Sequence, residues 1–417
     1  DHIGRAAMDM DWWTGNIDTA RLTDDFDNAG LTSGEAWTDF CEQLKSAGAQ
    51  ILRDDAPSTP LDRATGFRHL MALLWTGVNQ AMVYSSPRQP RFSQVARTDV
   101  FKWGLDCPDA AYRSASIDGS QNYRITGRLG SAHYLSFQVN EGMANHGNIR
   151  GDQLELEPDG SFVLWVGPQT RTGNWMPTPP DADFLIVRQF FYDWSTEEAA
   201  SLQIERIPDP GEVADLENPN AATPERVARQ LSSVATWLNA SAKFWVDVEV
   251  MGQMSDRNRF QPATAKPESG GAIENLNGWG HFDLGPDDAL IIDVQPASAL
   301  YWSVHLGNFW WESLDYCYRH TSLNGFQAEL DADGRFRAVV AHRDPGVANW
   351  LDTCGHARGP MLFRWVVADH APDPTGTVVP FGEIRRHLPE GTREVSPAQR
   401  RDIIATRRSG VLRRFSP

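Results

Sequence analysis

Residues suited to acid–base chemistry gather in the C-terminal third of the chain. His305 precedes Asp315 by ten positions, and Asp352 precedes His356 by four. A carboxylate beside a histidine fixes the tautomer of the imidazole and raises its pKa, which prepares the ring to act as a base. We therefore expect His305 or His356 to be the base and Asp315 or Asp352 to be its partner or acid. Tyr301 is the expected hydrogen-bond donor.

Aromatic and polar side chains are concentrated in residues 308–320. Trp310, Trp311 and Tyr316 are typical of an apolar pocket for a hydrophobic ligand, and Glu312 is a polar group that would orient it. The alternative is an ordinary folded loop with a half-buried ion pair.

Metal and cofactor sites find little support in the motifs. Cys317 with His320 and Cys354 with His356 supply two thiols and two imidazoles, but Cys-x-His is a tighter spacing than zinc ligands usually have. The chain contains no G-x-x-x-x-G-K-[ST] loop and no G-x-G-x-x-G between a strand and a helix. We expect no metal and no cofactor.

Arg188 and Arg364 each interrupt a segment that is otherwise apolar. A buried guanidinium needs a partner that accepts two hydrogen bonds, so structural ion pairing is the first interpretation of both. Binding of an anion or a carboxylate is the alternative, and Arg364 is included among the substrate-binding candidates for that reason.

These candidates lie in one of two similar halves. Tyr134–Val139 and Tyr301–Leu306 both alternate, at an offset of 167 residues. Asp159-Gly160 and Asn174-Trp175 recur as Asp333-Gly334 and Asn349-Trp350, at offsets of 174 and 175. The order and spacing indicate a tandem duplication with an insertion of about seven residues in the second copy.

Alternation assigns each residue of the first repeated strand to a face. One face carries Leu135, Phe137 and Val139 in the first copy and Trp302, Val304 and Leu306 in the second; the other carries Tyr134, Ser136 and Gln138, and Tyr301, Ser303 and His305.

Each copy supplies about 90 residues of strands, which favours a jelly-roll-like β-sandwich whose sheet edges are covered by helices. Helical spacing predicts helices over residues 33–52, 61–83 and 223–243, with Phe67, Leu70 and Leu73 in an apolar stripe facing the core. The predicted fold is mainly β (α+β): two tandem β-sandwich modules with flanking helices. The expected parts are a helical N-terminal region (1–116), a first module (117–208), a helical connector and loop (209–272), a second module (273–390) and a basic helical tail (391–417).

The sequence resembles the bacterial domain of unknown function 1214. The resemblance rests on Asp106-Cys107-Pro108-Asp109 with Tyr112, Ile117-Asp118-Gly119-Ser120, Tyr134-Leu135-Ser136-Phe137-Gln138, Gly173-Asn174-Trp175-Met176-Pro177 and Asn349-Trp350-Leu351-Asp352. It implies jelly-roll modules, and the C-terminal module resembles a divergent copy of the N-terminal one. It implies no catalytic residues.

Composition narrows the partners. A net charge of −17 and a pI near 5.0 oppose binding to nucleic acid. Because the chain has no apolar run of about 18 residues and no leader-like start, we expect no membrane span and a cytoplasmic location. The arginines after residue 399 predict a solvated or subunit-docking tail.

Divergence after duplication frees one copy to specialise, so we expect the site in the second module. The leading hypothesis is a cofactor-independent enzyme that hydrates, dehydrates or hydrolyses a small, largely apolar molecule. Two alternatives are a non-catalytic protein that binds a small hydrophobic molecule and a structural module that forms homo-oligomers.

Overall fold

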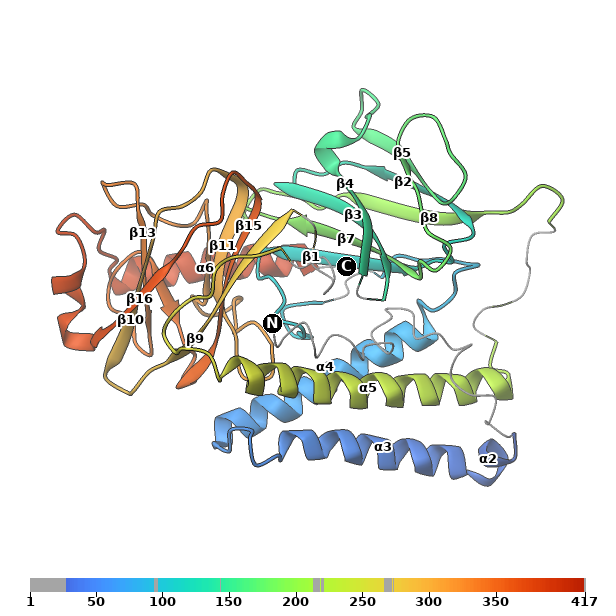
Figure 1. The fold of residues 1–417 in the computed structure, drawn as a ribbon, viewed down its shortest axis with the longest axis horizontal. Helices are drawn as coiled ribbons and strands as arrows, with labels where there is room; N and C mark the ends of the chain where they lie inside the picture. Colours follow the sequence, from blue (N-terminus) through green and yellow to red (C-terminus); the bar gives the residue numbers. More distant parts are fainter. Residues whose placement is uncertain are drawn as a thin grey trace.

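Two β-modules lie side by side above a layer of long helices (Figure 1). The computed structural model describes residues 28–93, 97–142, 144–212, 218, 221–265, 272 and 274–415. No helix in these ranges has both the length and the apolar character that a membrane span requires.

The helical layer is built from segments on either side of the first module. Its helices are α2 (Asn28–Ser33), α3 (Glu35–Ile51), α4 (Pro60–Met82) and α5 (Pro224–Gly252). Both α4 and α5 begin with a Thr-Pro pair: the hydroxyls of Thr59 and Thr223 accept the third amide of each helix, and proline needs no partner at the first position. The predicted helices are present, and α5 continues beyond residue 243 because Trp245 and Val248 extend its buried face.

The first module is a sandwich of two four-stranded sheets. Their strand orders are β1-β7-β3-β4 and β6-β5-β2-β8. The strands are β1 (Ala110–Ser116), β2 (Asn122–Arg128), β3 (Tyr134–Glu141), β4 (Ala144–Arg150), β5 (Ser161–Val166), β6 (Trp175–Met176), β7 (Phe184–Phe190) and β8 (Ser201–Ile207), with the short 3-10 helix η2 (Gly151–Gln153) after β4. Leu135, Phe137 and Val139 fill the space between the sheets, as alternation predicts.

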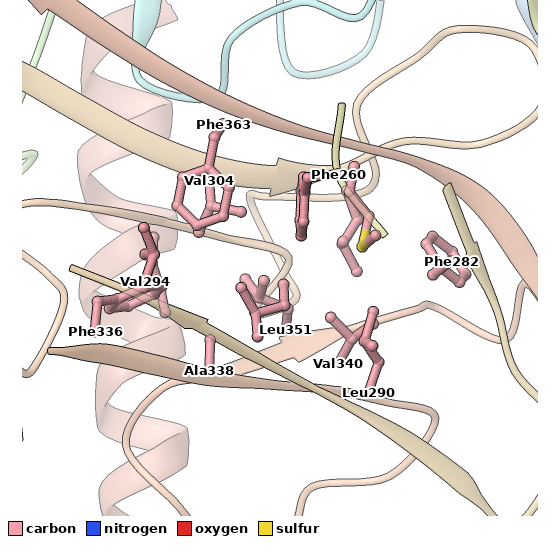
Figure 2. Close-up of a cluster of buried hydrophobic side chains, with 14 of the residues drawn as sticks. Phe260, Phe282, Leu290, Val294, Val304, Phe336, Ala338, Val340, Leu351 and Phe363 are labelled. Carbon is pink, nitrogen blue, oxygen red and sulfur yellow. The ribbon is translucent and has the colours of Figure 1, made fainter. Parts of the chain in front are cut away.

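The second module repeats this architecture, with strand orders β12-β11-β15-β9 and β14-β13-β10-β16. Its elements are β9 (Asn275–Asp283), β10 (Asp288–Val294), β11 (Ala299–Leu306), β12 (Ser322–Asn324), β13 (Phe336–Ala341), β14 (Trp350–Asp352), β15 (Arg358–Ala368), β16 (Thr375–Pro380) and the 3-10 helix η4 (Phe381–His387). Figure 2 shows the core between its sheets, where Val304 and Phe363 face Phe336 and Leu351.

Every strand of one module has a counterpart in the other. Adding eight to each label converts the first pair of strand orders into the second, including the parallel pairs β5-β6 and β13-β14. The turns at Gly160 and Gly334 adopt nearly the same positive φ, 78° and 77°. The predicted tandem duplication of a β-sandwich is therefore confirmed.

The modules differ most after their third strand. A tight hairpin joins β3 to β4, whereas residues 307–321 separate β11 from β12. The offset between the modules rises from 167 at Ser136 and Ser303 to 174 at their strand partners Arg150 and Asn324, so the predicted insertion of about seven residues lies here, and the segment contains Trp310 and Trp311.

Two expectations about the periphery need correction. Phe67 is predicted to face the core, but it is 45% exposed because α5 covers the adjacent face of α4, where Leu73 is fully buried. In addition, β1 precedes the boundary expected at residue 117, so the first module begins earlier.

The basic tail is an integral element. It forms α6 (Pro397–Phe415), which runs behind the second module toward β1 of the first (Figure 1). Arg400 and Arg407 are each only 4% exposed. Arg407 donates to Ser322 of the second module, and Arg413 donates to the Trp194 carbonyl of the first. The tail thus joins the modules of one chain and is not simply solvated.

Candidate functional site

Trp310 and Trp311 anchor the second module to the helical layer. The Trp310 ring lies against Gly66 of α4, and its Nε1 donates to the Asp62 carbonyl at 2.8 Å. The Trp311 ring stacks on Trp245 of α5 with centroids 5.3 Å apart, and its Nε1 donates to Glu249 at 2.9 Å. Both rings contact helices.

The neighbouring candidates are engaged in separate contacts. Glu312 Oε1 lies 3.4 Å from Nδ1 of His69 on α4. The Tyr316 ring lies 4.3 Å from the ammonium of Lys102. Asp315 is exposed, and its carboxylate accepts the backbone amides of Cys317 and Tyr318.

Asp352 and His356 do not pair with each other. Asp352 Oδ2 accepts from Arg319 Nε at 2.7 Å, while His356 Nδ1 lies 3.1 Å from Asp62 Oδ1 at the start of α4. The pKa of Asp62 is lowered overall. Burial is the largest single influence and acts to raise this pKa, but the hydrogen bonds with His356 and Thr59 and nearby positive charge together outweigh burial. Within the described ranges, no three His, Cys, Asp or Glu side chains converge as metal ligands do.

Tyr301, His305 and Arg364 are the candidates that the fold does bring together. Ser303 on β11 is the register partner of Arg364 on β15, and Tyr301 and His305 lie two residues to either side of Ser303. All four side chains therefore share the sheet face turned away from the sandwich core. Arg364 is 8% exposed and the other three are fully buried.

The outer face of the first module covers this surface, because β1 and β7 lie next to β11 and β15 (Figure 1). Phe190 of β7 contacts the Tyr301 ring at a centroid distance of 4.8 Å, and the Arg364 guanidinium lies 5.8 Å from the Phe190 ring. We use the name inter-module site for the buried polar groups where these surfaces meet: Tyr301, Ser303, His305 and Arg364 of the second module, with Arg188 of the first module and Arg97.

Beside this site, the carboxylate of Asp109 links the two modules through hydrogen bonds to side chains of both. Its carboxylate accepts hydrogen bonds from Tyr301 Oη at 2.6 Å, Asn324 Nδ2 at 2.7 Å and Trp194 Nε1 at 2.8 Å. Burial, followed by the charge of Asp109, raises the pKa of Tyr301 well above its usual value. Tyr301 is therefore a neutral hydrogen-bond donor whose proton is committed to Asp109.

Cations exceed accessible carboxylates at the inter-module site. Arg97, Arg188 and Arg364 lie near one another. Burial, together with the charge of Arg364, lowers the pKa of Arg97. Burial, together with the charges of Arg97 and Arg364, lowers the pKa of Arg188 to about 10. Burial also acts to lower the pKa of Arg364, but the acidic groups around it produce a net increase. Asp109 is occupied by its three donors, and Asp106 accepts from Ser313.

Several polar atoms around Arg364 have no hydrogen-bond partner among the described residues. They are one terminal nitrogen of Arg364, the Ser303 hydroxyl and both ring nitrogens of His305. Burial, then the charge of Arg364, lowers the pKa of His305 well below its usual value, although a polar contact with the Leu105 backbone, too long or too bent to meet hydrogen-bond geometry, opposes this change. His305 is consequently neutral near pH 7, with nitrogens able to donate and accept.

The arginine at the equivalent place in the first module has an acceptor within its own module, although the Ser136 hydroxyl, like that of Ser303, is buried without a hydrogen-bond partner among the described residues. Ser136 and Arg188 are register partners there, as Ser303 and Arg364 are in the second module. Gln138, at the position of His305, accepts from Arg188 and donates to Asn140 at 2.8 Å. The second module thus lacks an amide acceptor at the position that serves the arginine of the first.

Arg97, Ser303 and Asp109 are functional candidates that the sequence did not indicate. Ser303 could have been found by aligning the repeats, because its counterpart Ser136 stands opposite Arg188. Arg97 and Asp109 precede the first strand and reach the second module only through the tertiary fold, so no local spacing indicates them.

A family model and solved structures match this chain. The family described as "Protein of unknown function (DUF1214)" matches residues 110–192. The crystal structure of an uncharacterised protein from Burkholderia cenocepacia is 35% identical, covers 85% of this chain and 99% of its own, and superposes with a TM-score of 0.78. The VPA0106 protein from Vibrio parahaemolyticus is 10% identical, covers 80% of this chain and 100% of its own, and has a TM-score of 0.43. No protein with a curated description matches. The chain belongs to the DUF1214 family.

Proposed function

We propose that the inter-module site binds a small molecule carrying a carboxylate, with Arg364 as its principal ligand. The observation that carries this proposal is the contrast between two equivalent arginines. Arg188 donates to Gln138, whereas Arg364 has a buried nitrogen without a partner in the described structure, beside the similarly unpartnered His305.

A carboxylate fits these groups chemically. The guanidinium fork matches two carboxylate oxygens, and such charge-assisted hydrogen bonds are strong when water is excluded. A buried polar atom without a partner costs about 1–3 kcal/mol, so a ligand that supplies the partner recovers that cost. Phe190, Tyr301 and Val366 pack in a buried hydrophobic cluster beside Arg364, which keeps water away from the charged group.

Electrostatics favour an anion here even though the protein as a whole is acidic. Arg97 and Arg364 approach each other in the interior, and the carboxylates nearest to them, Asp106 and Asp109, already accept hydrogen bonds from other side chains. An anion between these cations relieves their mutual repulsion.

The test is binding of propionate at low ionic strength, measured by titration calorimetry and by the increase in Tm. We expect saturable binding to the wild type, a loss of about tenfold in affinity for Arg364→Lys and no detectable binding for Arg364→Met. Arg343→Met, which changes an exposed arginine paired with Asp287, is the matched control and should bind normally. Equal binding by Arg364→Met and the control would exclude the proposal.

Acid–base catalysis on the bound carboxylate is a second candidate, favoured by one observation. His305 is a neutral imidazole whose nitrogens have no partner among the described residues, so one of them is free to accept a proton, and its lowered pKa makes it a weaker base than an ordinary histidine. The measurement is hydration of crotonate, followed by loss of its ultraviolet absorbance. Turnover by the wild type that persists in His305→Gln at saturating crotonate would exclude His305 as the base.

A further inference from the structure

The polar groups beside Arg364 specify more than a charge. The Ser303 hydroxyl lies directly across from Arg364 in the register, and His305 is the next residue along β11 on the same face. Both are fully buried, and neither makes a side-chain hydrogen bond within the described residues. A carboxylate held by the Arg364 fork would leave these two side chains still requiring a partner.

That partner must be uncharged. The neutral His305 provides no counter-charge, and a second buried charge without a counter-ion is strongly disfavoured. Lys102 is the other cation near His305, but its ammonium already donates to the carbonyls of Ser313 and Leu314, at 3.1 and 2.8 Å. A hydroxyl oxygen on the ligand could accept a hydrogen bond from Ser303 and either donate to His305 or accept from it, whichever tautomer is present. A carbonyl oxygen could accept from both Ser303 and His305.

Strand geometry places this oxygen close to the carboxylate. Directly opposed residues have Cβ atoms about 4.5–5.5 Å apart, and diagonal neighbours about 7–8 Å apart. The side chains of Ser303 and Arg364 therefore start close enough together for both to reach one small ligand. In a carboxylic acid, the oxygen nearest to the carboxylate is one bonded to the adjacent carbon, C2.

We infer that the ligand is a 2-hydroxy or 2-oxo carboxylate, with its carboxylate on Arg364 and its neighbouring oxygen on Ser303 and His305. This inference rests on the proposed carboxylate site and adds the chemical class of its ligand. The first module differs at the arginine and at the position of His305, because Gln138 there bonds to Arg188 and Asn140, while its Ser136 hydroxyl is without a partner in the described structure as that of Ser303 is.

The experiment compares propionate, lactate and pyruvate, which share a three-carbon skeleton and differ only at the second carbon. We expect lactate or pyruvate to bind the wild type about tenfold more tightly than propionate, as one or two added hydrogen bonds imply. Ser303→Ala and His305→Leu should each remove most of this preference while propionate binding remains. Ser136→Ala, the equivalent change in the first module, is the matched control and should keep the preference.

The outcomes separate the two proposals. Equal affinity of the wild type for all three acids would overturn the ligand class and leave the carboxylate site standing. Failure of all three to bind would overturn both. A preference that survives in Ser303→Ala and His305→Leu but disappears in Ser136→Ala would place the neighbouring oxygen on the first module and overturn the assignment to the second.

Discussion

Gln138 and His305 occupy equivalent positions in the two modules, but only Gln138 bonds to the arginine beside it. The glutamine oxygen accepts from Arg188, whereas both nitrogens of His305 and one of Arg364 are buried without partners in the described structure. One exchange between related strands thus decides whether the arginine on that sheet face has an acceptor within its own module.

Replacing His305 by the first module's residue should close the site. In His305→Gln the amide oxygen can accept from Arg364, which we expect to raise the free energy of unfolding by about 1 kcal/mol and to weaken carboxylate binding about tenfold. Urea unfolding and calorimetric titration measure the two effects. The reciprocal change Gln138→His removes a bond and should lower stability; a His305→Gln protein that is both less stable and equally able to bind would contradict this account.

Asp109 should be essential for joining the modules. Asp109→Asn replaces one acceptor oxygen by a donor facing Tyr301, Asn324 or Trp194, all of which donate, so we expect a loss of about 2–4 kcal/mol in urea unfolding. Asp315→Asn is the control, because exposed Asp315 accepts only backbone amides through one oxygen. Similar losses in both variants would show that the three-donor arrangement has no special role.

Stability should fall as the solution is acidified below about pH 6.5, the ordinary pKa of histidine. Burial is the main cause that lowers the pKa of both His305 and His320 well below that value, and Arg364 and Arg407 are the next largest. The unfolded chain therefore binds protons that the folded chain does not, at a cost of up to about 1.4 kcal/mol per pH unit for each histidine. Urea unfolding near pH 7.5 and 5.5 should show a shallower pH dependence for His305→Gln. An unchanged dependence would mean that His305 is protonated in the folded protein.

A single methyl group should loosen α6. A Cβ at Gly410 would stand 2.5 Å from the Trp194 carbonyl oxygen, so Gly410→Ala should cost about 1–3 kcal/mol despite the better helix propensity of alanine. Gly48→Ala in α3 is the matched control: its Cβ meets nothing within 4 Å, and it should gain up to about 1 kcal/mol. Thermal unfolding of both variants provides the comparison, and a stabilised Gly410→Ala would show that α6 does not depend on this contact.

The face assignment of the repeated strands was available from the sequence. Alternation placed Phe137 and Val304 in the cores and placed Ser136, Ser303 and His305 on the opposite faces, and the structure agrees. Local spacing is sufficient here because a strand turns successive side chains to opposite sides whatever lies beyond it.

The location of the site depended on the tertiary structure. Trp310 and Trp311 have the composition of a pocket wall, yet they contact α4 and α5, which lie far before them in the chain. Residue type alone does not distinguish an aromatic ring that lines a pocket from one that fills an interface, because both positions favour large apolar surfaces.

The sequence by itself determined a duplicated β-sandwich with flanking helices, since alternation, turns and repeat spacing are local properties. Only the tertiary structure decided that the polar faces of the two modules meet. It placed Arg97 and Asp109 beside Tyr301 and Arg364, because contacts between modules depend on how whole sheets are arranged and leave no periodic signal in the chain.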